Sequence, residues 1–166
     1  MSINRRLSDL LAALRHLPDR AGWRAACIEL AWALPLLLIV AHAGGLARLQ
    51  SPPAASTAAT LAATLFVMPA LLEELLFRGL IIPREGPKAQ WITLSVLLFV
   101  LWHPLQVVTF GPPWAGSFLD PWFLIVVGIL GLALARMYAA TRSLWPSILT
   151  HWLVVLGWKA VFGGPF

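Results

Sequence analysis

The sequence predicts an all-α integral membrane protein, with a bundle of about five transmembrane helices and an amphipathic interfacial helix at the N-terminus. The chain has 166 residues, which is enough for one domain. Hydrophobic residues make up 60% of it and charged residues only 11%, whereas a soluble domain carries about 25% charged residues to keep its surface wet. The apolar residues are gathered into five long stretches without strand-like alternation, so helices are the expected spanning elements.

Residues 1–24 form a separate basic segment ahead of a single transmembrane domain at residues 25–166. The segment holds five of the 12 lysine and arginine residues, namely Arg5, Arg6, Arg15, Arg20 and Arg24. Its apolar residues recur at alternating steps of four and three, as on one face of a helix: Ile3, Leu7, Leu10, Leu14 and Leu17. The pattern predicts an amphipathic helix on an anionic membrane surface that ends at Pro18, and a disordered basic leader is the alternative.

The five apolar stretches cover residues 25–46, 54–82, 90–110, 121–138 and 144–162. Each approaches or exceeds the roughly 20 residues that a helix needs to cross a bilayer. The N-terminal segment and the 83–89 and 139–143 loops, with Arg136 nearby, collect nine basic residues, whereas the opposite side has only Arg48 and Lys159. The positive-inside rule therefore predicts a cytoplasmic N-terminus and an outer C-terminus in the cell (inner) membrane. The same rule assigns the net charge of +5 to topology, and no nucleic-acid partner is expected.

Three charged residues, Glu73, Glu74 and Arg78, interrupt the second apolar stretch. A charge near the bilayer centre costs at least about 2.5 kcal/mol, so these side chains should face a protein interior or a cavity. Glu74 and Arg78 are spaced i, i+4 and can pair, whereas Glu73 is rotated by about 100° and remains available as a general base. The alternative is that the helix ends near Leu72 and that the charges lie in the membrane interface.

Two histidines lie at a depth similar to that of Glu73. With a rise of 1.5 Å per residue, Glu73 lies about 13 Å from the cytoplasmic end of its stretch, while His103 and His151 lie about 20 Å and 10 Å from the starts of theirs. All three fall in one slab that faces the cytoplasm. They can therefore meet in one cavity, although each histidine alone would more often be a packed or interfacial residue.

These residues, in this order, resemble the CAAX protease and bacteriocin-processing family of intramembrane proteases, which includes the Ras-converting CAAX endopeptidases. The family signature is Glu-Glu-x-x-x-Arg, then Phe-x-x-x-His, then His-x-x-x-Asn or Asp, each on its own transmembrane helix. The segment from Glu73 to Arg78 fits the first motif, and Phe99 to His103 fits the second. His151 fits the third in its first residue only, because Val155 stands where the family has Asn or Asp.

The resemblance implies a metal-free, glutamic-type mechanism. In it, Glu73 and His103 bind and activate a water molecule, Glu74 and Arg78 hold the first motif in place, and His151 stabilises the oxyanion. Val155 cannot donate a hydrogen bond, and the oxyanion donors that remain open from the sequence are Thr150, Ser147, Gln106 and the Trp152 indole. Phe99, Trp102, Thr150 and Trp152 are expected to support the site or line a substrate groove.

The leading hypothesis is an intramembrane endopeptidase that cuts in or near a membrane-anchored or C-terminal hydrophobic segment, with residues 25–166 as its protease-like domain. The partners are then such a protein or peptide and the lipid bilayer, and the oligomeric state stays open. A non-catalytic scaffold or immunity factor is the alternative, which Val155 favours, and a proton or ion conduit is less favoured. No cofactor is expected. A metal held by the two glutamates and two histidines is the less favoured option, because no Glu-x-x-His or His-Glu-x-x-His pair is present.

Overall fold

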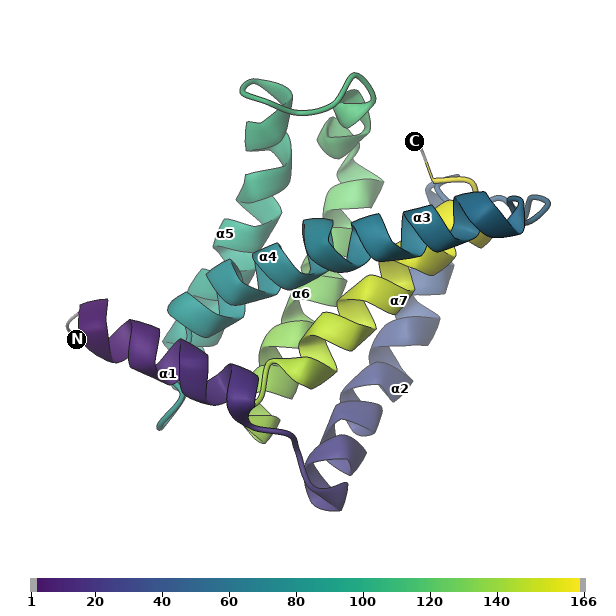
Figure 1. Ribbon diagram of the computed structural model, residues 1–166. Helices are drawn as coiled ribbons and strands as arrows, with labels where there is room; N and C mark the ends of the chain where they lie inside the picture. The colour runs from purple at the N-terminus through teal and green to yellow at the C-terminus, as the bar shows by residue number, and fades with distance from the viewer. Residues whose placement is uncertain (1–2, 165–166) are drawn as a thin grey trace.

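The computed structural model describes residues 3–164, and this part of the chain is helical and contains no strand (Figure 1). Four helical segments within it are long and apolar enough to cross a membrane: α2 (Arg20–Ala43), the segment Ala55–Leu80, α5 (Ala89–Val107) and α6 (Pro121–Thr141). The chain is therefore an all-α, multi-pass membrane protein, as predicted. The fifth predicted stretch forms α7 (Trp145–Val161), which has only 17 residues, so the predicted number of five spans is not confirmed.

The helix α6 is central to the bundle. It contacts α2, α5 and α7 (Figure 1), and ten of its residues are buried. Its sequence is apolar around its whole circumference, which is the composition expected of a helix that is surrounded by other helices. A short helix, η3 (Ala115–Leu119), lies between α5 and α6 and contacts both.

The second spanning segment is bent. It consists of α3 (Ala55–Leu65), η1 (Phe66–Leu71), α4 (Leu72–Glu74) and η2 (Leu75–Leu80). Met68 has a non-helical conformation, with φ −126° and ψ 115°, because the ring of Pro69 disfavours helical geometry in the residue before it. A new helical run thus starts at Pro69, and Glu73 lies about one turn after this start.

The helix α1 (Ile3–Arg15) lies across one end of the bundle and packs on η2 (Figure 1). Arg6 donates a hydrogen bond to the carbonyl of Ile81 at 2.8 Å, and the Trp145 indole donates to the carbonyl of Leu14 at 2.9 Å. The predicted N-terminal helix is therefore present, and it ends at Arg15, three residues before Pro18. Its contacts hold it against the end of the segment that carries the charged motif.

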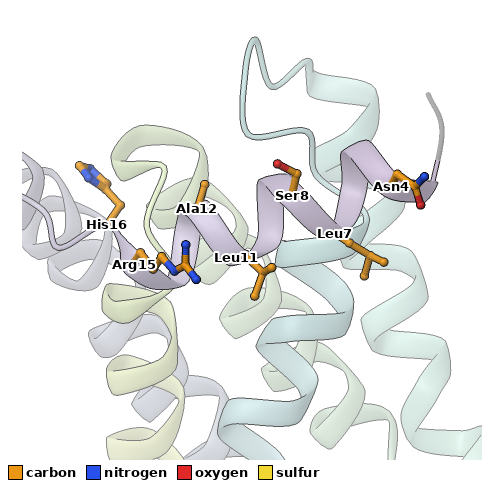
Figure 2. Close-up of a pocket in the computed structure, with 7 residues that line it drawn as sticks. All are labelled: Asn4, Leu7, Ser8, Leu11, Ala12, Arg15 and His16. Carbon is orange, nitrogen blue, oxygen red and sulfur yellow. The ribbon is translucent and has the colours of Figure 1, made fainter.

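The predicted apolar face of α1 is divided between two environments. Leu10 and Leu14 turn towards the bundle and are partly buried, whereas Ile3 and Leu7 remain exposed. A shallow hollow on the outer side is lined by residues of this segment alone (Figure 2), namely Asn4, Leu7, Ser8, Leu11, Ala12, Arg15 and His16. Because no other element closes this hollow, it is an open helix surface, and its exposed leucines are what an interfacial helix would present to a membrane.

The connecting segments gather at two ends of the fold. At the end that carries α1, Arg84 donates to the carbonyl of Arg142. At the other end, the backbone N–H groups of Arg48 and Gln50 donate to the carbonyls of Phe162 and Val161, each at 3.0 Å. The basic loops thus share one end, and the C-terminal end of α7 lies with the 47–53 segment at the other.

Candidate active site

The pairing predicted within the first motif is present and fully buried. The Arg78 Nη1 donates to Glu74 Oε1 at 2.8 Å, and both side chains have 0% exposure. The Nη2 of Arg78 donates to the carbonyl of Gly131 on α6 at 2.9 Å, and the guanidinium lies 4.4 Å from the centre of the Phe99 ring. Arg78, which lies on η2, therefore contacts both α5 and α6.

His151 on α7 is joined to both glutamates. Its Nδ1 lies 2.9 Å from Glu74 Oε1, and its Nε2 lies 3.8 Å from Glu73 Oε2. A carboxylate only accepts hydrogen bonds, so Nδ1–H is the donor to Glu74, which leaves Nε2 facing Glu73. The sequence predicted that Glu74 pairs with Arg78, and the contact between Glu74 and His151 was not anticipated.

Glu73 is held by a different set of contacts. Its Oε1 accepts a hydrogen bond from the Trp102 indole at 3.1 Å, whereas its Oε2 has no hydrogen-bonding partner among residues 3–164. Since Glu73 is only 7% exposed, this oxygen is a buried acceptor, and it lies 3.8 Å from Nε2 of the His151 ring. Trp102 thus orients the carboxylate that the sequence singles out as the base.

His103 is fixed by its own helix and by aromatic rings. Its Nδ1 lies 2.9 Å from the carbonyl of Phe99, and because a carbonyl can only accept, Nδ1 carries the proton and Nε2 keeps a lone pair. The ring packs edge-on against Phe99, with 5.1 Å between centroids, and also contacts Phe118 and Phe123. Phe99 also packs edge-on against His151, at 5.7 Å, so one buried ring supports both histidines.

A cavity of about 720 Å³ adjoins these groups and is lined by Glu73, His103 and His151. Its other walls are mostly apolar side chains of α2, α3 and α5 to α7, including Phe99 and Val155. Pockets of this size, with mostly apolar walls and a few polar groups, are typical of ligand-binding sites. The three residues that the depth argument placed in one slab therefore open onto one space.

The four residues proposed as alternative oxyanion donors differ in whether they line the cavity. Thr150 and Gln106 line the cavity. The Trp152 indole instead donates to the carbonyl of Ala62 on α3 at 2.8 Å, and the Ser147 hydroxyl donates to the carbonyl of Leu144 at 3.0 Å. These two side chains thus bond to backbone carbonyls, and neither Trp152 nor Ser147 is among the residues that line the cavity.

Two features of the site have no clear signal in the sequence. One is the backbone carbonyl of Gly131, which accepts from Arg78 and which no side-chain pattern reveals. The other is the aromatic wall of Phe118 and Phe123, whose rings stack 5.0 Å apart beside His103. Within residues 3–164, no three histidine, cysteine, aspartate or glutamate side chains are arranged to hold a metal ion.

The fold and the site define a class: a multi-pass helical membrane protein that keeps carboxylates, imidazoles and a guanidinium inside its bundle, beside an apolar cavity. The model of the family described as Type II CAAX prenyl endopeptidase Rce1-like matches residues 54–157, which is more than half of the chain. The protein therefore belongs to this CAAX protease family of membrane hydrolases, as the motifs predicted. No curated protein and no solved structure matches the chain.

Proposed function

We propose that this member of the CAAX protease family is a glutamic-type intramembrane endopeptidase. Its substrate is a membrane-anchored or C-terminal hydrophobic peptide segment that enters the cavity, and the peptide bond is hydrolysed by a water molecule activated by Glu73 and His103. The single observation that carries the proposal is the convergence of Glu73, His103 and His151 on one apolar cavity. These three residues come from three separate helices, so helix packing alone does not require them to meet.

The geometry supports a distinct role for each group. The carboxylate of Glu73 and the unprotonated Nε2 of His103 are acceptors for the two protons of a water molecule, and Glu73 takes one proton when the water attacks the carbonyl carbon. His151 in its doubly protonated form donates Nδ1–H to Glu74 and keeps Nε2–H for the oxyanion. When the intermediate collapses, the C–N bond breaks, and Glu73 passes its proton to the leaving amine.

In this scheme, Glu74 and Arg78 do not contact the substrate but hold other residues of the site in place. Glu74 accepts from both Arg78 and His151, so it fixes the His151 ring in the orientation that the oxyanion needs. Arg78 supplies the positive charge that a buried carboxylate requires. Both are positioning residues, and neither lines the cavity.

Val155 favours a second candidate, a non-catalytic scaffold of the same fold. It lines the cavity about one turn beyond His151, at the position where the motif would have a polar side chain. Loss of one oxyanion donor reduces the rate by about 10²–10³-fold, so the protease proposal needs another donor. Thr150 and Gln106 are the polar cavity residues that fit this need.

The test compares the termini of membrane peptides in cells that carry the wild type, a deletion or Glu73→Gln. We expect a new terminus that appears only with the wild type, because Gln retains the shape of Glu but cannot take a proton. Glu85→Gln is the matched control, since the same change is made at an exposed loop residue beside Arg5. The same termini in all four strains, with the proteins shown to be expressed, would favour the scaffold.

A further inference from the structure

One side of α1 contacts all three helices that carry the motifs. Arg6 donates to the carbonyl of Ile81, the C-cap residue of η2, at 2.8 Å, and its guanidinium lies 5.0 Å from the centre of the Trp91 ring of α5. The backbone N–H of Leu144, the N-cap residue of α7, donates to the carbonyl of Ala13 at 3.3 Å. The helix α1 therefore joins the ends of η2, α5 and α7 on one side of the fold.

These contacts lie close to the motif residues themselves. A Cβ atom on Gly79, the residue after Arg78, would come within 3.1 Å of Leu10 Cδ1, so Leu10 packs directly on this backbone. On α7, the Trp145 indole donates to α1, and His151 follows Trp145 by six residues, which is about 9 Å along a helix axis. A displacement of α1 would therefore change the packing next to both Arg78 and His151.

The leucines on the other side of α1 are exposed. Leu7 is 47% exposed and Leu11 is 50% exposed. In Figure 2, both side chains point to the side of α1 on which the helices of the bundle extend, whereas Ser8 and Ala12 point the other way. The two leucines thus face the space beside the spanning helices, which lipid fills in a membrane. An interfacial helix buries its apolar face in this way, at the boundary between headgroups and acyl chains.

Basic side chains accompany these leucines. Residues 3–24 carry five arginines and two acidic residues, and the side chains of Arg5 and Arg15 are exposed. Arg5 lies 3.7 Å from Glu85, but both side chains are more than half exposed, so this pair is weak and can open. An acidic protein would match the arginines alone. An anionic phospholipid matches both features, because its phosphate comes with acyl chains that cover the leucines.

We propose that α1 binds anionic phospholipid in the leaflet that it faces, and that this contact holds the ends of the three motif helices together. Leu7 and Leu11 enter the acyl region, while Arg5 and Arg15 bind the headgroup phosphates. The inference goes beyond the proposed function, because it concerns the packing of α1 and requires no cleaved peptide. It makes the order of the site depend on the composition of the membrane.

Hydrogen–deuterium exchange measures the lipid contact and its effect on the site. The full-length protein is placed in nanodiscs of phosphatidylcholine, or of equal parts of phosphatidylcholine and anionic phosphatidylglycerol. Each arginine near an anionic surface strengthens binding roughly fivefold, so two arginines should slow exchange in residues 3–15 about 25-fold in the anionic discs. Exchange in residues 144–151 should also slow. The amides of α3, which lies away from α1 in Figure 1, should not change.

A double substitution tests whether the arginines cause the dependence on lipid. Arg5→Gln combined with Arg15→Gln should remove the difference between the two kinds of disc, because the leucines and the contacts with η2 and α7 remain. Arg48→Gln is the matched control, since it changes an exposed arginine at the other end of the fold and should keep the difference. Exchange within α6 like that of the wild type shows that each variant is folded.

The outcomes judge the two parts of the proposal separately. Equal exchange of residues 3–15 of the wild type in both kinds of disc, or a difference that survives the double substitution, would overturn the lipid contact. Slower exchange in α1 without any change in residues 144–151 would overturn its role in holding the motif helices. Neither result depends on whether the protein cuts a peptide, which the comparison of membrane-peptide termini tests.

Discussion

At the scale of single residues, Arg78 has the strictest requirements. It is 0% exposed and contacts Glu74, the carbonyl of Gly131 and the Phe99 ring. Arg78→Gln would leave Glu74 as a buried charge without its cation, and we expect a loss of about 3–5 kcal/mol in the free energy of unfolding. Denaturation of the purified protein in detergent measures this loss.

A double mutant tests the cause of that loss. If the unpaired charge is responsible, adding Glu74→Gln to Arg78→Gln should recover part of the stability, because neither charge then remains. The matched control is Arg84→Gln, which removes an arginine whose described contact is an exposed hydrogen bond to the carbonyl of Arg142. A double mutant that is less stable than Arg78→Gln would contradict the explanation.

Trp102 and Trp152 provide a second comparison at the scale of single residues. Trp102 directly precedes His103, and Trp152 directly follows His151. The indole of Trp102 donates to Glu73, whereas that of Trp152 donates to the carbonyl of Ala62. We expect Trp102→Phe to lower kcat about tenfold while KM changes little, because the ring stays and only the bond to the base is lost. Trp152→Phe should leave kcat unchanged and reduce stability by about 1 kcal/mol. A steady-state assay on the substrate found from the peptide termini gives both constants, and equal effects on kcat would reject the role of Trp102.

At the scale of helices, the approach of α5 to α6 decides whether the site can form. A Cβ atom at Gly131 would come within 2.9 Å of Phe99 Cδ1, so Gly131→Ala must displace the ring that supports both histidines and Arg78. We expect a loss of about 1–3 kcal/mol in unfolding free energy and a parallel loss of activity. Thermal denaturation and peptide cleavage measure the two effects.

Gly128 is the matched control for this prediction. It lies on the same helix, about one turn earlier, and the nearest atom to an added Cβ is Val100 Cγ2 at 3.8 Å, which is ordinary contact. Because alanine favours a helix by about 1 kcal/mol over glycine, Gly128→Ala should keep activity and raise stability slightly. Equal losses at the two glycines would show that helix propensity or general packing, and not the Phe99 contact, is being measured.

At the scale of the whole molecule, the sequence predicts what depends on local chemistry. Charges at Glu73, Glu74 and Arg78 stand out because an apolar segment makes them costly, and the i, i+4 spacing predicts the Glu74–Arg78 pair that the structure contains. The contact of Glu74 with His151 could not be predicted, because those residues are 77 positions apart and their approach depends on how the helices pack. The contact of Arg78 with the carbonyl of Gly131 and the different partners of the Trp102 and Trp152 indoles also depend on helix packing, so the sequence did not predict them.

The number of membrane spans decides on which side of the membrane the C-terminus lies, so locating the C-terminus tests that number. Four spans would return the C-terminus to the side of α1, whereas five would place it opposite. The backbone contacts of Phe162 and Val161 with Arg48 and Gln50 bring the end of α7 to the 47–53 segment, so α7 runs back across the fold despite its 17 residues. We therefore expect the C-terminus to lie on the same side as that segment.

Single cysteines and a membrane-impermeant maleimide measure this arrangement. Cys27 is the only cysteine, so Cys27→Ser gives a background without thiols. In intact cells, cysteines introduced at Ser51 and Gly164 should both react. One at Glu85 should react only in inverted vesicles, because the positive-inside rule predicts that the basic loops face the cytoplasm. If the cysteine at Gly164 reacted under the same conditions as the one at Glu85, and not with the one at Ser51, α7 would not cross the membrane. The five-span arrangement would then be wrong.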